Sequence, residues 1–156
     1  MIEISEAVRS GKPEDYVSHC QVHVDGSCNG MQHYAAFGRD DNGARQVNLA
    51  DSERPGDVYT AILRLVIKDM DNETNPDLIE VAKSLEGQIT RKVIKQTVMT
   101  SVYGVTFIGA REQIQRQLKD LKIFETNGEL YKASYYLAKV TIKCIGDLFK
   151  DANAIK

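Results

Sequence analysis

The sequence predicts a mainly helical fold with one short β-strand. After residue 26, apolar residues recur at steps of three and four over most of the chain, which is the spacing of amphipathic helices. Only residues 21–25 alternate between β-branched and polar side chains, as a half-buried strand does. A single strand cannot form a sheet, so we expect this strand to pair with strands outside the 156 residues.

Turn signals divide the first third of the chain into short elements. Ser10-Gly11 ends a helix, Lys12-Pro13 breaks the chain again, and residues 26–30 have turn composition. The elements predicted here are a helix at 3–9, a helical turn at 14–17, the strand at 21–25, a helix at 31–37, a turn at 40–43 and an irregular segment at 45–50.

Longer helices are predicted over the remaining two thirds. Pro55 opens a helix at 56–70, and Gly87 and Gly104 separate the helices that follow it. Those helices are predicted at 76–85, 91–104 and 108–122, and a last helix follows a turn at 127–128. The last helix carries an apolar stripe that we expect to be core, or a seam against a partner helix, made of Tyr131, Tyr135, Ala138, Ile142, Ile145 and Phe149.

The predicted helix at 91–104 carries a pattern that suits a nucleotide. Residues at steps of four form one slowly winding stripe about 18 Å long; they are Arg91, Lys95, Met99 and Tyr103. A separate apolar stripe can anchor the helix to a core, and consists of Ile94, Val98 and Val102. Cations at one end and a phenol at the other suit the phosphates and the base and sugar of a nucleoside triphosphate. The alternative is a solvated basic face with a packed tyrosine, which is commoner on an arbitrary helix.

A second pattern, Val22 to His33, begins at the end of the predicted strand. Asp25 offers a hard oxygen ligand for Mg²⁺, and Gly26, which has no side chain, lets its own carbonyl approach the same ion. The alternative is that Asp25 or Ser27 only caps the next helix.

Charge and cysteine content narrow the choice of function. The net charge is −2, but residues 88–119 hold six basic residues and one acidic residue, while residues 1–87 hold eight basic and sixteen acidic residues. A basic block beside an acidic one suits phosphate on one side and a metal or solvent on the other. No apolar run is long enough to predict a membrane span. Three cysteines without a CxxC pair indicate a reducing compartment and no disulfide framework.

Both patterns resemble the phage-type, single-subunit DNA-dependent RNA polymerases, and most closely their mitochondrial branch. Residues 24–36 are similar to polymerase motif A and residues 91–111 to motif B, while residues 46–49 and 56–59 between them also resemble the family. An Arg-x3-Lys-x7-Tyr-Gly pattern alone is shared with related DNA polymerases. Gly26-Ser27 after the aspartate separates the RNA enzymes, because the DNA enzymes usually place a bulky aromatic residue there.

The resemblance implies a role for each matched residue. Asp25 would be one of two carboxylates that bind the catalytic Mg²⁺ pair, and Gly26 would lend its carbonyl. Arg91 and Lys95 would hold the triphosphate, with Lys95 donating a proton to the leaving pyrophosphate, and Tyr103 would favour a ribose 2′-hydroxyl. The implied catalytic residues are thus Asp25, Lys95 and Tyr103, and the implied nucleotide-binding residues are Arg91, Lys95, Met99, Tyr103 and Gly104.

The resemblance also implies a partial palm and fingers of a right-hand polymerase. Residues 1–50 would be the palm part with motif A, and residues 51–156 the mostly helical fingers part with motif B, without a linker between them. The implied activity is DNA-templated RNA synthesis from NTPs by two-metal phosphoryl transfer, with a DNA template and an RNA–DNA hybrid as partners, in the mitochondrion. The family's second metal aspartate lies in a His-Asp-Ser motif that this sequence lacks, so the chain alone is expected to be inactive.

Two other functions fit some of the residues. A zinc module could draw on five residues, although their spacing matches no usual structural zinc pattern; they are His19, Cys20, His23, Cys28 and His33. A helical nucleic-acid- or partner-binding module without chemistry would use the basic block at 88–119 and the stripe of the last helix. Protection of Lys95 by a triphosphate with Mg²⁺ would indicate the enzyme, and salt-sensitive duplex binding would indicate the module.

Overall fold

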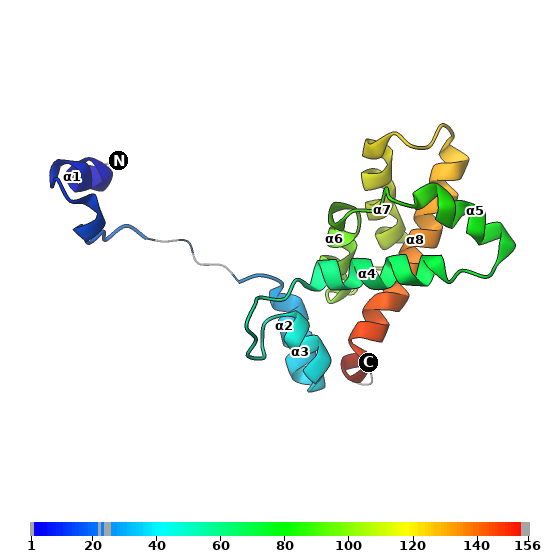
Figure 1. Ribbon diagram of the computed structural model, residues 1–156, viewed down its shortest axis with the longest axis horizontal. Helices are drawn as coiled ribbons and strands as arrows, with labels where there is room; N and C mark the ends of the chain where they lie inside the picture. Colours follow the sequence, from blue (N-terminus) through cyan, green and yellow to red (C-terminus); the bar gives the residue numbers. More distant parts are fainter. Residues whose placement is uncertain (1, 22, 24–25, 154–156) are drawn as a thin grey trace.

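The computed structural model describes residues 2–21, 23 and 26–153, and this part of the chain is helical without a strand (Figure 1). Gln21 and His23 lie in no regular element, and the other three residues of the predicted strand lie outside the described residues. The elements are α1 (Ile2–Arg9), the 3₁₀ helix η1 (Pro13–Asp15), α2 (Asn29–Gly38), α3 (Asp41–Gln46), α4 (Val58–Asp71), α5 (Pro76–Leu85), α6 (Arg91–Ser101), α7 (Phe107–Leu121), α8 (Asn127–Leu148) and α9 (Lys150–Asn153). The prediction of a mainly helical chain is confirmed.

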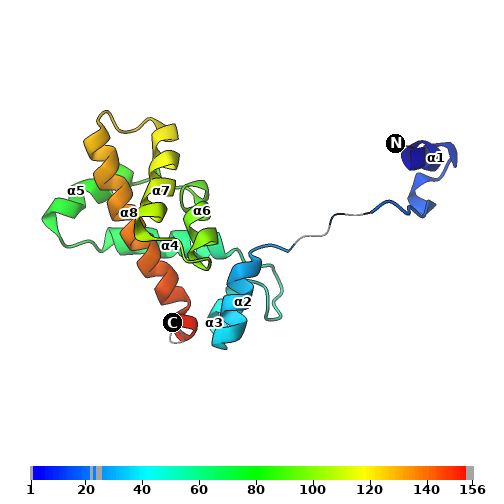
Figure 2. The ribbon, with the colours of Figure 1, turned by 180° about the vertical axis from the view of Figure 1, so that it is seen from behind.

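Helix α8 is the centre of the helical body, where it packs against α4, α5, α6 and α7 (Figures 1 and 2). The turn predicted at 127–128 is wrong, because these residues form the first turn of α8. A capping box explains why: the Thr126 hydroxyl accepts from the Glu129 amide at 3.2 Å, and the Glu129 carboxylate accepts from the Thr126 amide at 3.2 Å. These two bonds satisfy amides that a helix start leaves without partners.

Three of the six residues in the apolar stripe predicted for the last helix are core. Ala138, Ile145 and Phe149 are buried, whereas Tyr131, Tyr135 and Ile142 are 49%, 46% and 37% exposed. Steps that alternate between four and three have a period of 3.5, which drifts by about 20° per heptad on a straight helix. The stripe therefore does not stay on the core side of α8, and for Tyr131, Tyr135 and Ile142 the alternative of a seam against a partner helix stays a prediction.

A second group of helices, α2, α3 and α9, packs at the C-terminal end of α8 (Figure 2). Phe149 is fully buried there, with its ring centroid 6.0 Å from that of Tyr34. Gly38 lies so close to Ala152 that a Cβ at this position would collide with the Ala152 backbone. This close approach places α2, the helix of motif A, directly against α9.

Helix α3 corrects the turn predicted at 40–43 and the first two residues of the irregular segment predicted at 45–50, while residues 47–50 lie outside any helix as predicted. Asp40 is buried, and its carboxylate accepts from the Gly43 amide at 2.7 Å, so it is the N-cap of α3. The same residue types that favour turns also favour N-caps, because their short polar side chains reach nearby backbone amides. The sequence pattern alone does not distinguish the two outcomes.

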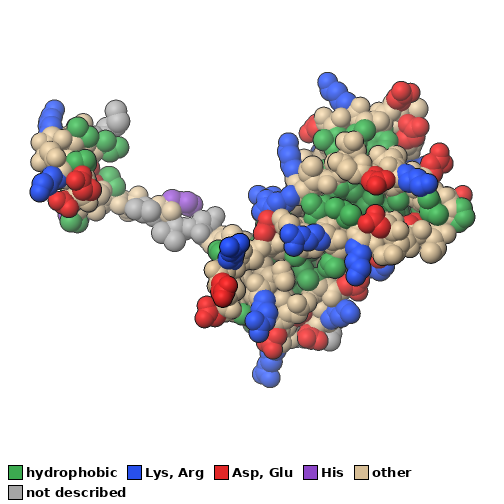
Figure 3. Space-filling view, viewed as in Figure 1, with side chains coloured by type: hydrophobic (Ala, Val, Ile, Leu, Met, Phe, Trp, Pro, Cys, Tyr) green, Lys and Arg blue, Asp and Glu red, His purple; other side chains and the backbone are tan. Residues whose placement is uncertain are grey.

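Residues 2–20 lie apart from the helical body (Figures 1 and 3). Helix α1 contacts η1, and the Glu3 carboxylate accepts from the backbone amides of His19 and Cys20. Apolar side chains of α1 are exposed, among them Ile2 and Val8. Of the helices that the structure describes, none has both the length and the apolar character needed to span a bilayer.

Candidate functional site

Helix α6 presents its basic stripe to solvent and its apolar stripe to the core. Ile94 and Val98 are fully buried and Val102 is half-buried, as the spacing predicted. Arg91 and Lys95 are exposed, and Met99 is 45% exposed. The helix ends at Ser101, three residues earlier than predicted.

Tyr103 and Gly104 lie in the turn that follows α6. Gly104 has a φ of +79°, a left-handed conformation that glycine adopts without strain. The Tyr103 ring is 75% exposed. The turn thus places the exposed phenol beyond the last residue of α6.

The start of α2 packs directly against this turn, which brings motif A and motif B together. A Cβ on Gly30 would lie 2.5 Å from Val102 Cγ2 and 2.8 Å from the Tyr103 hydroxyl oxygen. One residue further on, the sulfur of Met31 is 3.9 Å from the Ser101 hydroxyl oxygen. Only a glycine leaves room for the tyrosine at this position.

Arg91 is held by the N-cap of α4. Its Nε donates to Asp57 Oδ2 at 2.8 Å and its Nη2 donates to Oδ1 at 3.4 Å, while Asp57 also accepts from the Thr60 hydroxyl at 2.7 Å. The guanidinium carbon lies 4.6 Å from the ring centroid of Tyr59. Burial alone would raise the pKa of Asp57, but the bonds from Arg91 and Thr60 outweigh it and hold that pKa below its usual value.

Lys95 lies near the same ring. Its Nζ is 5.8 Å from the Tyr59 centroid, which is within the range of a cation–π attraction. Tyr59 itself is only 7% exposed, so its ring is held by the surrounding core while both cations lie near it. The Tyr59 ring contacts both cationic side chains, and Asp57 holds the Arg91 side chain in place.

A loop held by Asn48 positions Asp57. The Asn48 side chain donates to the Gly56 carbonyl at 3.0 Å and accepts from the Gly56 amide at 2.6 Å. On the other side of this loop, Gln32 of α2 donates to the Val47 carbonyl at 2.8 Å. The loop therefore connects the motif A helix to the residue that holds Arg91.

The predicted metal ligands are only partly covered by the structure. Asp25 lies outside the described residues, and Gly26 is exposed with the Asn29 side chain against it. Within residues 2–21, 23 and 26–153, no three His, Cys, Asp or Glu side chains gather in a way that could hold a metal ion.

The whole chain, residues 1–156, matches the family described as DNA-dependent RNA polymerase. The chain belongs to this family. It is 51% identical over 160 residues to DNA-directed RNA polymerase 1, mitochondrial, of Arabidopsis thaliana, and 50% identical over 159 residues to DNA-directed RNA polymerase 2B, chloroplastic/mitochondrial, of Nicotiana tabacum. Each comparison covers 99% of this chain and 16% of the relative. DNA-directed RNA polymerase 2A of Nicotiana tabacum is 51% identical, over 99% of this chain and 48% of the relative.

The resemblance inferred from motifs A and B is thereby confirmed, and the relatives of this polymerase segment include mitochondrial enzymes. Asp57 and Tyr59 are the site residues to which sequence reasoning gave no role. Residues 56–59 resembled the family, which could have drawn attention to both residues. Nothing in their spacing linked them to Arg91, however, because Asp57 and Arg91 are 34 positions apart in the sequence.

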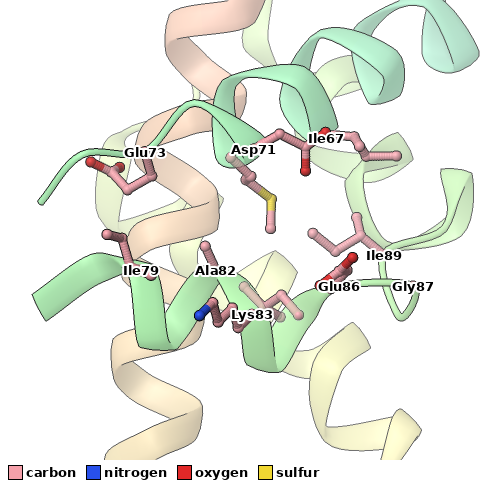
Figure 4. A pocket seen from close by; sticks show the side chains of 11 residues that line it. Ile67, Asp71, Glu73, Ile79, Ala82, Lys83, Glu86, Gly87 and Ile89 are labelled. Carbon is pink, nitrogen blue, oxygen red and sulfur yellow. The ribbon is translucent and has the colours of Figure 1, made fainter. Parts of the chain in front are cut away.

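The hollow in Figure 4 lies elsewhere in the polymerase segment, between α4 and α5. It measures about 290 Å³, and none of the stripe residues of α6 lines it. Its charged lining is mostly acidic, with Asp71, Glu73 and Glu86 and a single basic residue, Lys83, which does not suit a triphosphate.

Proposed function

We propose that this segment binds the incoming NTP during DNA-templated RNA synthesis by a full-length polymerase. The contact between Gly30 of motif A and Tyr103 of motif B supports the proposal most strongly, because it joins the two motifs into one site. The exposed row of Arg91, Lys95 and Met99 leads toward this contact along a single helix. Phosphoryl transfer depends mainly on positioning and charge stabilisation, which a rigid row of cations supplies.

Arg91 and Lys95 would bind the triphosphate. Asp57 occupies two N–H groups of Arg91, so three of the five guanidinium donors remain for phosphate oxygens. Lys95 has no carboxylate partner among the ion pairs of the described residues. Its ammonium group is free to follow the phosphates and to donate a proton to the leaving pyrophosphate.

Tyr103 would contact the ribose, with Met99 and Gly104 beside it. Its exposed hydroxyl is available to a ligand, and the packing against Gly30 sets where the ring lies. A phenol that pairs with the 2′-hydroxyl penalises a substrate that lacks this group, because a buried polar group is then left without a partner.

Mg²⁺ would be held by the Asp25 carboxylate and the Gly26 carbonyl, together with a second carboxylate that the 156 residues do not supply. Carboxylate and carbonyl oxygens are the ligands that this ion takes. When bound, a metal pair stabilises charge on the attacking and leaving oxygens. The residues described above orient the nucleotide and its phosphates toward that pair.

In the full-length enzyme, residues 1–50 would belong to the palm and residues 51–156 to the fingers. Residues 21–25 would form their strand there, because a strand needs neighbours to pair with. We assign this polymerase to the mitochondrion, and its partners are the DNA template and the RNA–DNA hybrid.

Substitution of Lys95→Ala in a full-length polymerase that carries this segment tests the proposal. We expect kcat for nucleotide addition to fall by at least about a hundredfold, which is the usual effect of removing a general acid. Lys68→Ala, at an exposed lysine of α4, is the matched control and should leave kcat unchanged. Equal activity of the Lys95 variant and the control would remove Lys95 from the reaction.

Two further measurements separate the roles within the site. In the full-length polymerase, Tyr103→Phe should increase dNTP incorporation while most NTP activity remains; unchanged dNTP incorporation would exclude the ribose contact.

The 156-residue chain alone should extend no primer with Mg²⁺ and NTPs, because one carboxylate cannot hold two metals. Extension that Asp25→Ala abolishes would contradict this expectation.

A further inference from the structure

The end of α4, the loop after it and α5 form an acidic surface of the helical body. Residues 69–86 hold six carboxylates and one basic residue, Lys83, whereas residues 88–119 hold six basic residues and one acidic residue. A polyanion is therefore attracted to α6 and α7 and repelled from α5. Nucleic acids and anionic lipid surfaces do not suit this acidic surface, which consists of Asp69, Asp71, Glu73, Asp77, Glu80 and Glu86.

Two of the six carboxylates have no cationic partner in the part of the chain that the structure describes. Asp69 pairs with Lys143 at 2.6 Å, and the Glu73 carboxylate accepts from two backbone amides of its own loop. Asp71 and Glu86 are exposed and take part in none of the ion pairs. Their charges are therefore available to a cationic ligand.

Both of these carboxylates lie at the hollow between α4 and α5 (Figure 4). Ile67 of its lining is 42% exposed and Leu85 is fully buried, so the lining runs from the surface into the core. The volume of about 290 Å³ is at the lower end of small-molecule pockets, roughly 300–1,000 Å³, and accommodates an apolar side chain of a partner. The apolar lining is made of Ile67, Met70, Ile79, Ala82, Leu85 and Ile89.

A second hollow, on another face of α5, extends the acidic surface. Its lining holds four carboxylates and one basic residue. The first hollow takes Ile79, Ala82 and Lys83 from α5, and these residues follow the spacing of one helical face. The second hollow takes residues of a different face, namely Asp77, Glu80, Val81 and Ser84. A protein segment that lies across α5 thus meets negative charge along its whole length.

We propose that the hollow between α4 and α5 docks a basic amphipathic helix of a partner protein. An apolar side chain of that helix fills the hollow, and lysines or arginines beside it pair with Asp71 and Glu86. Residues three and four apart share one face of a helix, so the anchor and its flanking cations can be presented together. Charge complementarity of this kind selects the partner and accelerates its association. The proposal is independent of the nucleotide site, since none of the stripe residues of α6 lines the hollow.

Binding of a fluorescein-labelled peptide to a full-length polymerase that carries this segment tests the proposal. The probe is an amphipathic helix of leucine and lysine, about five turns or 18 residues long. We expect its affinity to fall with salt, and Asp71→Lys/Glu86→Lys to weaken it by at least about tenfold, because attraction becomes repulsion. Asp41→Lys/Asp120→Lys is the matched control, since it changes the net charge equally at exposed positions outside the hollow. The control should retain the affinity.

A second substitution tests the apolar lining while both carboxylates remain. Ile67→Gln should weaken peptide binding by at least about threefold, because the apolar anchor then meets a polar group. Ile67 is partly exposed, so the substitution leaves the core intact. Ile142→Gln, at a position that is 37% exposed on α8, is the control and should have no effect.

Cross-linking identifies the surface that the peptide occupies. A benzophenone in place of a central leucine should react with residues 67–89, as mass spectrometry of the products would show. Three results would overturn the proposal: cross-links outside this range, equal weakening by the two double substitutions, or equal binding of a peptide that carries glutamate in place of lysine. Unchanged affinity of the Ile67→Gln variant would also overturn it, because the hollow would then hold no anchor.

Discussion

Two arginine–tyrosine pairs have the same separation between guanidinium and ring but differ in the burial of the ring and in the carboxylate beside the arginine. The guanidinium carbon of Arg91 lies 4.6 Å from the ring centroid of Tyr59, and that of Arg111 lies 4.6 Å from the ring centroid of Tyr131. The Arg91 pair has a buried ring and a carboxylate that makes two hydrogen bonds to the guanidinium. The Arg111 pair has a half-exposed ring and one long contact, 3.5 Å between Arg111 Nη2 and Glu112 Oε1.

The difference shows that a site formed by more segments of the chain is sensitive to substitutions at more positions. Four segments build the first site along α6: the start of α4 holds Arg91, the loop at 48–56 leads into that start, and the start of α2 packs against the turn at the other end of α6. Two adjacent helices alone form the Arg111 pair. A change in any of the four segments should disturb the first site, whereas the second should respond only to its own side chains.

Among the substitutions that compare the two sites, the largest effect is expected from Gly30→Ala, which tests whether the first site depends on close packing. The new methyl group would displace Tyr103, and misplacing a substrate-contacting group by about 1 Å can cost a hundredfold in rate. We expect nucleotide addition by a full-length polymerase to fall by at least about tenfold. Gly128→Ala is the control, because it occupies the same second position of a helix and its Cβ would have no neighbour closer than 4.0 Å.

A smaller effect is expected from Asp57→Ala, measured as the free energy of unfolding in urea. The substitution removes the N-cap of α4 and the partner of Arg91. N-cap losses cost about 1 kcal/mol, and the ion pair adds little because its side chains are 45% and 40% exposed. A variant as stable as the unmodified chain would show that α4 does not need this cap.

The same carboxylate predicts a dependence of stability on pH. The pKa of Asp57 is lower in the folded chain than its usual value of 3.8, so its charged form stabilises the fold above about pH 4. This contribution is lost as the pH falls through the folded pKa. The stability difference between the unmodified chain and Asp57→Asn should therefore shrink from pH 7 to pH 3; a constant difference would exclude the carboxylate charge as its cause.

The smallest effect is expected at the second pair. Glu112→Ala should change the free energy of unfolding by less than about 0.5 kcal/mol, because an ion pair at 3.5 Å whose carboxylate side chain is 51% exposed contributes little. If Glu112→Ala lowered the free energy of unfolding as much as Asp57→Ala does, the two pairs would contribute equally to the stability of the fold. Thermal unfolding followed by circular dichroism is sufficient for this comparison.

The sequence alone predicted the local features of this segment. The buried Ile94 and Val98 and the exposed Arg91 and Lys95 follow from a 3.6-residue period, which any α-helix imposes on its own side chains. Membership in the RNA polymerase family also followed from the residues of motifs A and B, and the match of residues 1–156 to the family confirms it. Helix boundaries were less certain, because Asp40 and Asn127 stand in segments that suit both turns and helix starts.

Only the tertiary structure decided which residues meet. The pairing of Arg91 with Asp57, the contact of Gly30 with Tyr103 and the exposure of Tyr131 depend on how separate helices pack. No periodicity encodes these contacts, since a periodic pattern states which face of a helix is apolar and not which neighbour covers it. The sequence therefore determined the faces of the helices, and the packing of α2, α4 and α6 determined the site between them.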